Sequence, residues 1–348
     1  MKLYTDTSHY EGHKDWKHVP HVIRPFFERD SETDRLVEMY LSRTLQEADY
    51  AVLPMTPEYY LISNKQLMME SFIKQAREAG KPIIVFNDGD AGVRYPFPQD
   101  VIVLRQNAYQ SRRKSNEYGN SFIVEEDPMR EYLHQTGIVV REKREKPVVG
   151  FDGLGGETLI MTAYHTLVNL FTNIKCYTHL SIYEPNKLLP GTTIRSKALD
   201  FFERDGRIAA NFNRRSAFRA GAKTPEDQRQ KTTEFYKNMM ESDYVLCVRG
   251  GGNFSKRFYE TLAMGRIPVF INTDCVLPFD NIIDWKKFVV WVEQSEIKHI
   301  ADKLVEFHKS ITNDEFKAMQ RSCRELWEKH LNREGVLSSL GSLIQQSL

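Results

Sequence analysis

The segment best suited to binding a ligand is an apolar run that leads into three consecutive glycines and then into a helical pattern. The apolar run ends at Arg249, glycine occupies positions 250–252, and the helical pattern begins at Ser255. Glycine lets a backbone approach a ligand at places where a Cβ would intrude. The free amides at a helix start, together with the helix dipole, favour an anion such as a diphosphate. Arg249 and Arg257 flank this place, and guanidinium groups fit phosphate oxygens.

A carboxylate follows within the same helical pattern. Glu260 lies one to two turns after Ser255, where it could accept hydrogen bonds from both hydroxyls of a ribose. We expect the strand, the glycines and the helix at the carboxyl edge of a parallel sheet, where open α/β sheets bind ligands. A tight turn before a capped helix is the alternative, and the flanking arginines favour ligand binding over it. A P-loop is excluded because the Gly-Lys-Ser/Thr ending is absent.

The elements that must position these residues read as two successive α/β domains. Strands are expected at 2–4, 50–53, 83–86, 101–104, 121–124, 147–151, 244–248 and 267–271. Helices are expected from about 30 to 41 and at 66–79, 157–171, 225–240, 255–264, 295–309 and 313–330. Strands that alternate with helices predict parallel sheets covered on both faces. The charged run 141–146 reads as a solvated linker, which divides the chain into domains at 1–145 and 146–348.

Composition excludes several classes of protein. The chain has 348 residues with a formal charge of +1, and a balance this even argues against a dedicated nucleic-acid binder. No apolar run approaches the roughly 20 residues that span a bilayer, and the amino terminus lacks the apolar core of a signal peptide. The four cysteines stand far apart without a CxxC pair, which is typical of reduced thiols. We therefore expect a soluble, cytoplasmic protein, and its oligomeric state stays open.

Residues 242–288 resemble the signature of the exostosin family of glycosyltransferases. The resemblance rests on order and spacing over some fifty residues, namely Val248-Arg249-Gly250, Ser255, Arg257, Glu260, Leu262, Gly265, Pro268, Leu277-Pro278-Phe279, Trp285 and Phe288. The amino-terminal half is similar more loosely, through residues 2–6, 47–54 and 86–90. Arg249 follows valine rather than the family's proline, Thr261 replaces its usual alanine, and Arg266 replaces a common cysteine. These departures remove no predicted ligand-binding group.

The resemblance implies a GT-B architecture, in which two Rossmann-like domains with parallel sheets face a cleft. The carboxyl-terminal domain would hold a nucleotide sugar, generally a UDP-sugar, and the amino-terminal domain a saccharide acceptor. Helices 295–331 would pack back near the domain junction. Arg249, Ser255 and Arg257 would contact the diphosphate, and Glu260 the ribose. The full predicted donor site is Arg249, Gly250, Gly251, Gly252, Asn253, Ser255, Lys256, Arg257 and Glu260.

The resemblance also implies inversion at the anomeric carbon. Many retaining GT-B enzymes carry a glutamate eight positions before the ribose-binding one, and here that position is Gly252. Inversion requires a general base from a loop of the amino-terminal domain. The candidates follow the first and third strands and are Asp6, Asp88, Asp90 and His9, with Asp6 and Asp88 ranked together ahead of the others. We expect no metal requirement, because no DxD-like motif lies in a donor loop and arginines can neutralise the diphosphate. Many eukaryotic family members carry an amino-terminal membrane anchor that this chain lacks, so a bacterial or viral type of enzyme is expected.

Further positions are possible contributors to the cleft. The loop 152–156 follows the first strand of the second half, and its glycines fail the G-x-G-x-x-G spacing of dinucleotide-binding sites. The basic stretch 207–231 reads either as a solvated face or as a mobile loop that adds positive charge around an anion. His9, His13, His18 and His21 match no common zinc pattern, so a polar surface loop is favoured there. The possible contributors are Gly153, Gly155, Arg214, Arg215 and Arg219.

Two functions compete with glycosyl transfer. One is a catalytically inactive partner that binds glycan or nucleotide, and the intact set of Arg249, Arg257 and Glu260 argues against it. The other is a nicotinamide oxidoreductase, which the failed fingerprint at 152–156 disfavours. The donor sugar, the acceptor and the linkage are not specified by any pattern in the sequence.

Overall fold

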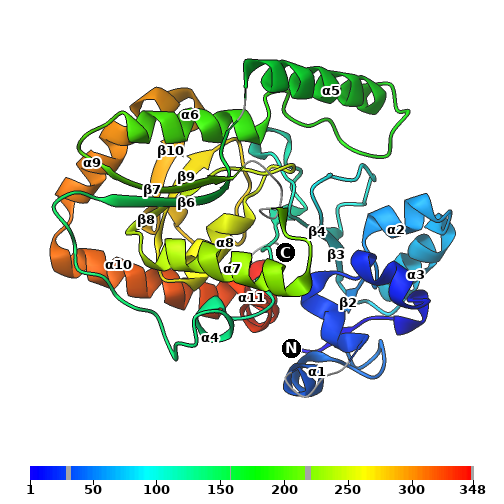
Figure 1. Ribbon diagram of the computed structural model, residues 1–348. Coiled ribbons are helices and arrows are strands. Elements are labelled where there is room, and N and C mark those ends of the chain that lie inside the picture. Colours follow the sequence, from blue (N-terminus) through cyan, green and yellow to red (C-terminus); the bar gives the residue numbers. More distant parts are fainter. Residues whose placement is uncertain (29–32, 157, 216–220, 346–348) are drawn as a thin grey trace.

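The computed structural model describes residues 1–28, 33–156, 158–215 and 221–345. Within them, strands form two five-stranded sheets, and every neighbouring pair of strands in both sheets is parallel (Figure 1). Helices lie on both faces of each sheet. This arrangement confirms the predicted α/β fold with two parallel sheets. Residues 30–32, in the expected helix from about 30 to 41, lie outside the described residues.

The first sheet adds its strands in sequential order. It runs β1-β2-β3-β4-β5, with β1 (Leu3–Tyr4) at one edge and β5 (Glu117–Gly119) at the other. Between them lie β2 (Tyr50–Val52), β3 (Ile83–Asn87) and β4 (Val101–Arg105). All residues of β3 and β4 are buried, as expected for strands covered on both faces.

Helices from both ends of the chain cover this first sheet. One face packs against α2 (Pro57–Ile62) and α3 (Gln66–Glu78). The other face packs against α1 (Asp34–Tyr40) and, from the far end of the chain, α11 (Arg333–Gln345). α11 was not predicted, and its buried Leu337 and Leu340 complete the core of a sheet built more than 200 residues earlier.

The second sheet has strands added on both sides of its first strand, β6 (Val148–Leu154). Its order is β10-β9-β8-β6-β7, where β7 is Ala209–Arg215, β8 Tyr244–Cys247, β9 Ile267–Asn272 and β10 Val290–Glu293. The chain adds β7 on one side of β6 and β8 on the other. In doubly wound sheets, this reversal opens a crevice at the carboxyl ends of the two central strands, where ligands bind. Here those ends are the loops after β6 and β8.

Two layers of helices cover the second sheet. α6 (Gly191–Glu203) and α9 (Ile300–Ser310) cover one face. α7 (Pro225–Met240), α8 (Lys256–Ala263) and α10 (Asn313–Leu326) lie on the other, as Figure 1 shows. The core beneath α8 and α10 continues through α11 to the first sheet. A short helix, α4 (Pro128–Glu131), and the long α5 (Leu159–Tyr177) lie outside these layers.

The charged run 141–146 is solvated only in part, since residues 142 and 144–146 are exposed and Arg141 is held against the protein. Arg141 donates through Nε to the fully buried Asp243 at 2.8 Å, and its amide donates to Gln320. Arg144 accepts a 2.7 Å hydrogen bond from His308 through its carbonyl. Arg141 supplies the cationic partner that the buried carboxylate of Asp243 needs. This pair holds the start of the run against the helices of the second sheet. The division of the chain at 145/146 stays a prediction. Within the predicted helices 295–331, Trp327 and Leu331 belong to the core that both sheets share.

Several elements differ from their predicted forms. Residues 121–124 form no strand, and β5 instead occupies Glu117–Gly119. α6, β7 and β10 were not predicted. β7 is an edge strand with no fully buried residue, and its polar residues Asn211, Asn213 and Arg214 leave no apolar run to recognise. Short or polar strands of this kind give little apolar signal.

Candidate functional site

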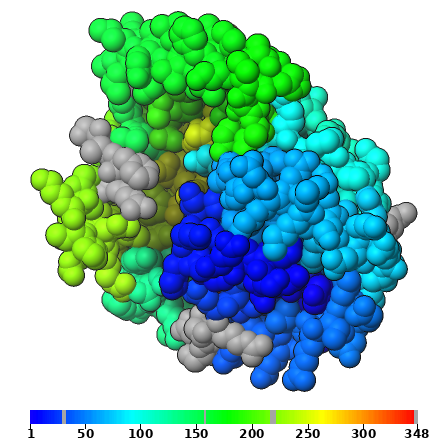
Figure 2. All heavy atoms as spheres, turned by 90° about the vertical axis from the view of Figure 1, so that its right-hand side faces the viewer, coloured from blue at the N-terminus to red at the C-terminus, as the bar shows by residue number. Residues whose placement is uncertain are grey.

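The predicted donor residues lie where the second sheet reverses. The loop after β8 holds Arg249 and the glycines, and it lies beside the end of β6 at Gly153. The space-filling view in Figure 2 shows a hollow between the blue amino-terminal residues and the green and yellow-green parts of the chain. Yellow atoms, whose colour marks residues near 250, are visible at the back of this hollow. The site is thus at the place that open α/β sheets offer to ligands.

Arg257, in the first turn of α8, spans this reversal. Its Nη2 donates to the carbonyl of Asp152 at 2.6 Å, and its guanidinium carbon lies 4.3 Å from the centre of the Phe151 ring. Its buried Nε has no hydrogen-bond partner, and burial lowers the pKa of the guanidinium. A buried cationic donor with an unused N–H is short of an acceptor, so an anion placed here would be stabilised.

Gly153 leaves the space that the guanidinium of Arg257 occupies. The residue has φ +152°, and a Cβ on it would lie only 2.8 Å from Nη2 of Arg257. Gly155 is packed differently, because its Cβ would meet Leu199 and the side chain of Arg214 at 3.0 Å. Gly153 therefore leaves room for Arg257, and Gly155 leaves room for side chains of α6 and β7.

Glu260 lies one turn further along α8. Burial raises the pKa of its carboxyl, and the charges of Arg257 and Lys256 together with a hydrogen bond from Tyr236 oppose that rise. The Tyr236 ring lies 5.1 Å from the ring of Tyr132. Glu260 therefore has one donor in the free protein and retains acceptor capacity for another.

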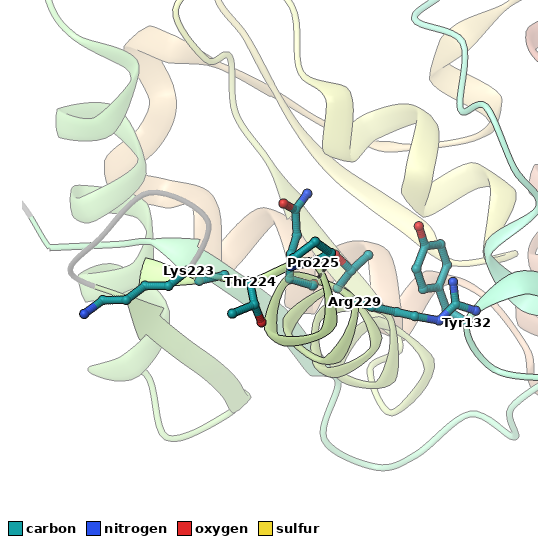
Figure 3. Close-up of a pocket in the computed structure, with 8 residues that line it drawn as sticks. Tyr132, Lys223, Thr224, Pro225 and Arg229 are labelled. Carbon is teal, nitrogen blue, oxygen red and sulfur yellow. Dashed lines mark hydrogen bonds between the residues drawn. The ribbon is translucent and has the colours of Figure 1, made fainter.

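Tyr132 connects Glu260 to a pocket of about 430 Å³. Figure 3 shows its labelled residues at the beginning of α7, with Tyr132 and Arg229 at one side and Lys223 at the other. The guanidinium of Arg229 lies 5.4 Å from the Tyr132 ring centre. The lining consists of Tyr132, Ala222, Lys223, Thr224, Pro225, Gln228, Arg229 and Thr232.

Arg249, which was expected to contact the diphosphate, is only 3% exposed. Its Nη2 donates to the carbonyl of Leu189, its Nε has no partner, and burial lowers its pKa. Arg195, on the unpredicted α6, donates to the carbonyls of Leu154 at 2.9 Å and Arg249 at 3.4 Å, and its guanidinium shares the Phe151 ring with that of Arg257. Sequence reasoning missed Arg195 because it missed α6, and the only local signal was Pro190 followed by Gly191 at the helix start.

The glycine loop also contacts the first domain. A Cβ on Gly251 would lie 3.3 Å from Oδ2 of Asp90, and one on Gly252 would lie 2.8 Å from the carbonyl oxygen of Asp90. Asn253 is buried, and its backbone N–H donates to Oδ1 of Asn107 at 2.8 Å. The side chain of Asn253 is also used, through a bond to the carbonyl of Ala108. Gly252 and Asn253 therefore lie against the loops that follow β3 and β4, whereas Gly250 and Gly251 are exposed.

The start of α8 keeps polar groups near the loop. Ser255 is the N-cap residue, but its side chain makes no capping hydrogen bond. Lys256 is exposed, and its ammonium lies 4.8 Å from the centre of the Phe122 ring. The amide of Gly250 is already used by the carbonyl of Phe254. An anion would therefore meet the Ser255 hydroxyl and the α8 amides rather than the Gly250 amide.

The candidate bases lie in different surroundings. His9 is buried, with Nδ1 2.7 Å from the hydroxyl of Tyr60, and burial lowers its pKa. Asp6 accepts a hydrogen bond from the amide of Ser8 and follows the edge strand β1. Asp90 is exposed beside the glycine loop. The structure brings Asp90 to the donor loop, and the described contacts of Asp6 and His9 stay within the first domain.

Asp88 is paired with a histidine that was not singled out from the sequence. Its Oδ1 accepts from Asn120 at 2.6 Å, while its buried Oδ2 has no hydrogen bond and lies 3.8 Å from Nδ1 of His21. The His21 ring is 6.2 Å from that of Phe122, which Lys256 of α8 also covers. His21 had appeared only as one of four clustered histidines, and nothing local marks it as the one that faces a carboxylate.

The remaining basic positions are paired with acids. Arg215 donates to both oxygens of Asp152, at 2.7 Å through Nη2, and Arg214 donates to Asp200 and Glu203 at 2.8 Å. Neither is free to add charge around an anion without breaking these pairs. Arg219 lies outside the described residues.

Within the described ranges, no group of three or more His, Cys, Asp or Glu side chains is placed to hold a metal ion. No helix in the same ranges is both long and apolar enough to cross a bilayer. The lack of a metal requirement and the cytoplasmic location both stay predictions.

Comparison with known proteins identifies the segment that carries the site. Residues 192–307 match the Exostosin GT47 domain. The chain is 29% identical to Exostosin-1 of Drosophila melanogaster over 125 residues, which is 35% of this chain and 16% of the relative. It is 38% identical over 71 residues to "Probable glucuronosyltransferase 47 A" of Physcomitrium patens, which covers 20% of this chain and 16% of the relative. The chain thus spans about a sixth of these relatives.

Solved structures of low similarity extend over most of the chain. Anabaena HepE in complex with UDP aligns with 99% of this chain and all of its own, at 12% identity and a TM-score of 0.35. A glycosyltransferase from Rickettsia africae aligns with 90% of this chain and 79% of its own, at 10% identity and a TM-score of 0.34. The resemblance to exostosin-like glycosyltransferases is confirmed by the family match over α6 to α9, the segment that contains the glycine loop, Arg257 and Glu260.

Proposed function

We propose that this protein is an inverting glycosyltransferase that moves a sugar from a UDP-sugar to a saccharide acceptor. The observation that carries the proposal is Arg257, a half-buried guanidinium whose buried Nε is unused, at the reversal of the second sheet. The exostosin family match over this segment supports the reaction class. UDP bound to HepE and the names of the plant relatives are consistent with a nucleotide-sugar donor.

The donor's diphosphate would lie between Arg257 and the start of α8. Arg257 and the Ser255 hydroxyl would bind its oxygens, and the exposed Lys256 adds positive charge nearby. Glu260 would accept from the ribose hydroxyls while keeping its bond from Tyr236. The base would then extend toward Tyr132, whose ring borders the pocket beside α7. As the bond to the sugar breaks, Arg257 would stabilise the charge that develops on UDP.

The acceptor side would use His21 and Asp88 together. Asp88 is too buried to reach an acceptor, whereas the side chain of His21 is 27% exposed. The imidazole would take the proton of the acceptor hydroxyl, and Asp88 would stabilise the imidazolium. Arg24, Glu125 and Arg333 are the other charged groups near this pair, with Nε2 of His21 3.9 Å from Glu125. Asp90 is disfavoured because its carboxylate would repel a diphosphate held by the adjoining loop.

The activity itself is testable with purified protein. A panel of nucleotide sugars would be screened for UDP release, with and without oligosaccharide acceptors. We expect release with at least one UDP-sugar and the opposite anomeric configuration in the product. UDP binding without any turnover would support the inactive partner, and binding of NAD in place of UDP would support an oxidoreductase.

A further inference from the structure

Helix α5 (Leu159–Tyr177) is docked by its polar side. Asn173 pairs with the backbone of Asn186, donating to its carbonyl at 2.7 Å and accepting from its amide at 2.9 Å. Asn169 donates to the carbonyl of Leu188 at 3.0 Å, and the hydroxyl of Thr162 lies 3.2 Å from that of Thr193. Only Asn173 and Cys176 of this helix are buried. Polar side chains thus attach α5 to the protein, whereas α6 is attached by its buried apolar side chains, Ile194, Leu199 and Phe202.

The outward side of α5 is apolar. Leu159 is 89% exposed, Ile160 82%, Phe171 64% and Leu167 54%. At 100° per residue, the exposed apolar positions cover about half of the helix circumference. Figure 1 shows α5 as an outermost element beside α6, and Figure 2 shows the green part of the chain at the rim of the hollow. Soluble monomers rarely leave so continuous an apolar surface uncovered.

The charge on this surface distinguishes between possible occupants. Residues 158–183 contain no Asp or Glu, and their one formal charge is Lys175, which is exposed and lies within the apolar sector. If two copies paired through α5, each would bury this ammonium without an acid from the facing helix, which is costly. At a lipid surface the same lysine can extend toward phosphate groups while its stem stays among apolar chains. Tyr164 and Tyr177 have the amphipathic rings that membrane interfaces favour.

We propose that α5 lies in the interface of a lipid bilayer with its apolar side toward the acyl chains. The helix would not span the bilayer, because its polar side is bonded to the protein. The segment after α5 holds it in place: Glu184 pairs with the buried Arg105 at 2.7 Å, and Tyr183 donates to Glu58 at 2.5 Å. The surface is therefore fixed relative to the first sheet as well as the second. This inference is independent of the proposed glycosyl transfer.

The test is sedimentation of the purified protein with large unilamellar vesicles. Two compositions would be used, phosphatidylcholine alone and phosphatidylcholine with phosphatidylglycerol at 3:1. We expect binding to both, stronger with the anionic lipid. The double substitution Leu167→Glu and Phe171→Glu should lower vesicle binding at least tenfold. Leu67→Glu, at a position 81% exposed on α3, is the matched control and should change nothing. Lys175→Ala should lower binding about fivefold on anionic vesicles only.

A fluorescent variant keeps the test independent of disruptive charges. Phe171→Trp should fold as the natural chain does, and its added emission should shift to shorter wavelength when vesicles are present. No sedimentation of the natural chain with either vesicle would overturn the proposal, as would an unshifted Phe171→Trp emission. Light scattering that shows a dimer, lost in the double variant and without vesicle binding, would assign the surface to a second copy instead and would also overturn it.

Discussion

The two sheets of this protein differ in the one topological property that creates a ligand site. The second sheet reverses its strand order between β6 and β8, and its carboxyl edge presents Arg257 and Glu260. The first sheet runs in sequence from β1 to β5, and its described strands contain no reversal. Beyond its edge lie an aspartate and a histidine, Asp88 and His21. One sheet therefore provides cations for an anionic donor, and the other provides a carboxylate–imidazole pair suited to moving a proton.

Substitutions beside the two sheets should therefore affect different measured quantities. Changes beside the first sheet should affect turnover and leave UDP binding unchanged, since the donor contacts belong to the second sheet. Changes at the reversal of the second sheet should affect UDP binding first.

The largest effect is expected from the His21–Asp88 pair. His21→Ala and Asp88→Asn should each lower turnover by roughly 10²–10⁴ with UDP affinity unchanged, because a general base contributes on this scale. Asp100→Asn, at an exposed carboxylate that precedes β4 and pairs with Arg77, is the control and should be near normal. Steady-state kinetics and calorimetry would measure both quantities. Near-normal turnover in both pair variants, with loss in Asp90→Asn, would move the base to Asp90.

Glu260→Ala should weaken UDP binding by about 1–3 kcal/mol. The ribose hydroxyls would lose their acceptor in a partly closed site, and Tyr236 would lose its partner as well. Calorimetric titration would show the change, with Glu241→Ala, an exposed carboxylate at the end of α7, as the matched control. Equal UDP affinity in Glu260→Ala and the natural chain would show that the ribose is bound elsewhere.

Gly153→Ala should weaken UDP binding by roughly tenfold. The new Cβ would lie 2.8 Å from the Arg257 guanidinium, at a φ of +152° that side chains rarely adopt. Gly206→Ala, where a Cβ meets nothing within 4 Å, should bind UDP normally. Thermal melting of both variants would separate a local shift of Arg257 from general unfolding. Unchanged affinity in a folded Gly153→Ala protein would contradict the close coupling of β6 and α8.

The smallest effect is expected from metal removal. We predict that EDTA leaves turnover within about twofold, because arginine can neutralise the diphosphate in the role that a divalent ion has elsewhere. The measurement is initial rate before and after EDTA treatment, with manganese then added back. Complete loss that manganese restores would show that the donor site needs an ion.

Much of the architecture could be predicted from local patterns. β3, β8 and β9 are short, fully or almost fully buried apolar runs, and α7 has clear capping at Thr224, so strands and helices were expected close to where they lie. Arg257 and Glu260 were recognisable because their spacing from the glycines fits a known signature. α6 and β7 were not predicted, because β7 is polar and the start of α6 has no capping side chain.

What local patterns could not provide are pairings between distant segments. Arg141 reads as part of a solvated charged run until the buried Asp243 is placed beside it. Asp88 and His21 lie 67 positions apart, and no spacing rule connects a loop after β3 to a 3₁₀ helix near the amino terminus. Helix α5 reads as an ordinary helix after β6, but its apolar side faces outward because Asn169 and Asn173 bond to the following segment.

The central claim is that the reversal of the second sheet binds a nucleotide diphosphate through Arg257. Its most direct test is calorimetric titration of UDP into the natural chain, Arg257→Ala and the control Arg207→Ala, whose exposed guanidinium pairs with Asp205 and Asp302. We predict that UDP binds the natural chain and the control alike, and that Arg257→Ala weakens binding by about 10- to 100-fold, the scale of a hydrogen bond to a charged group. Equal UDP affinity in all three proteins, or no binding to any of them, would contradict the account.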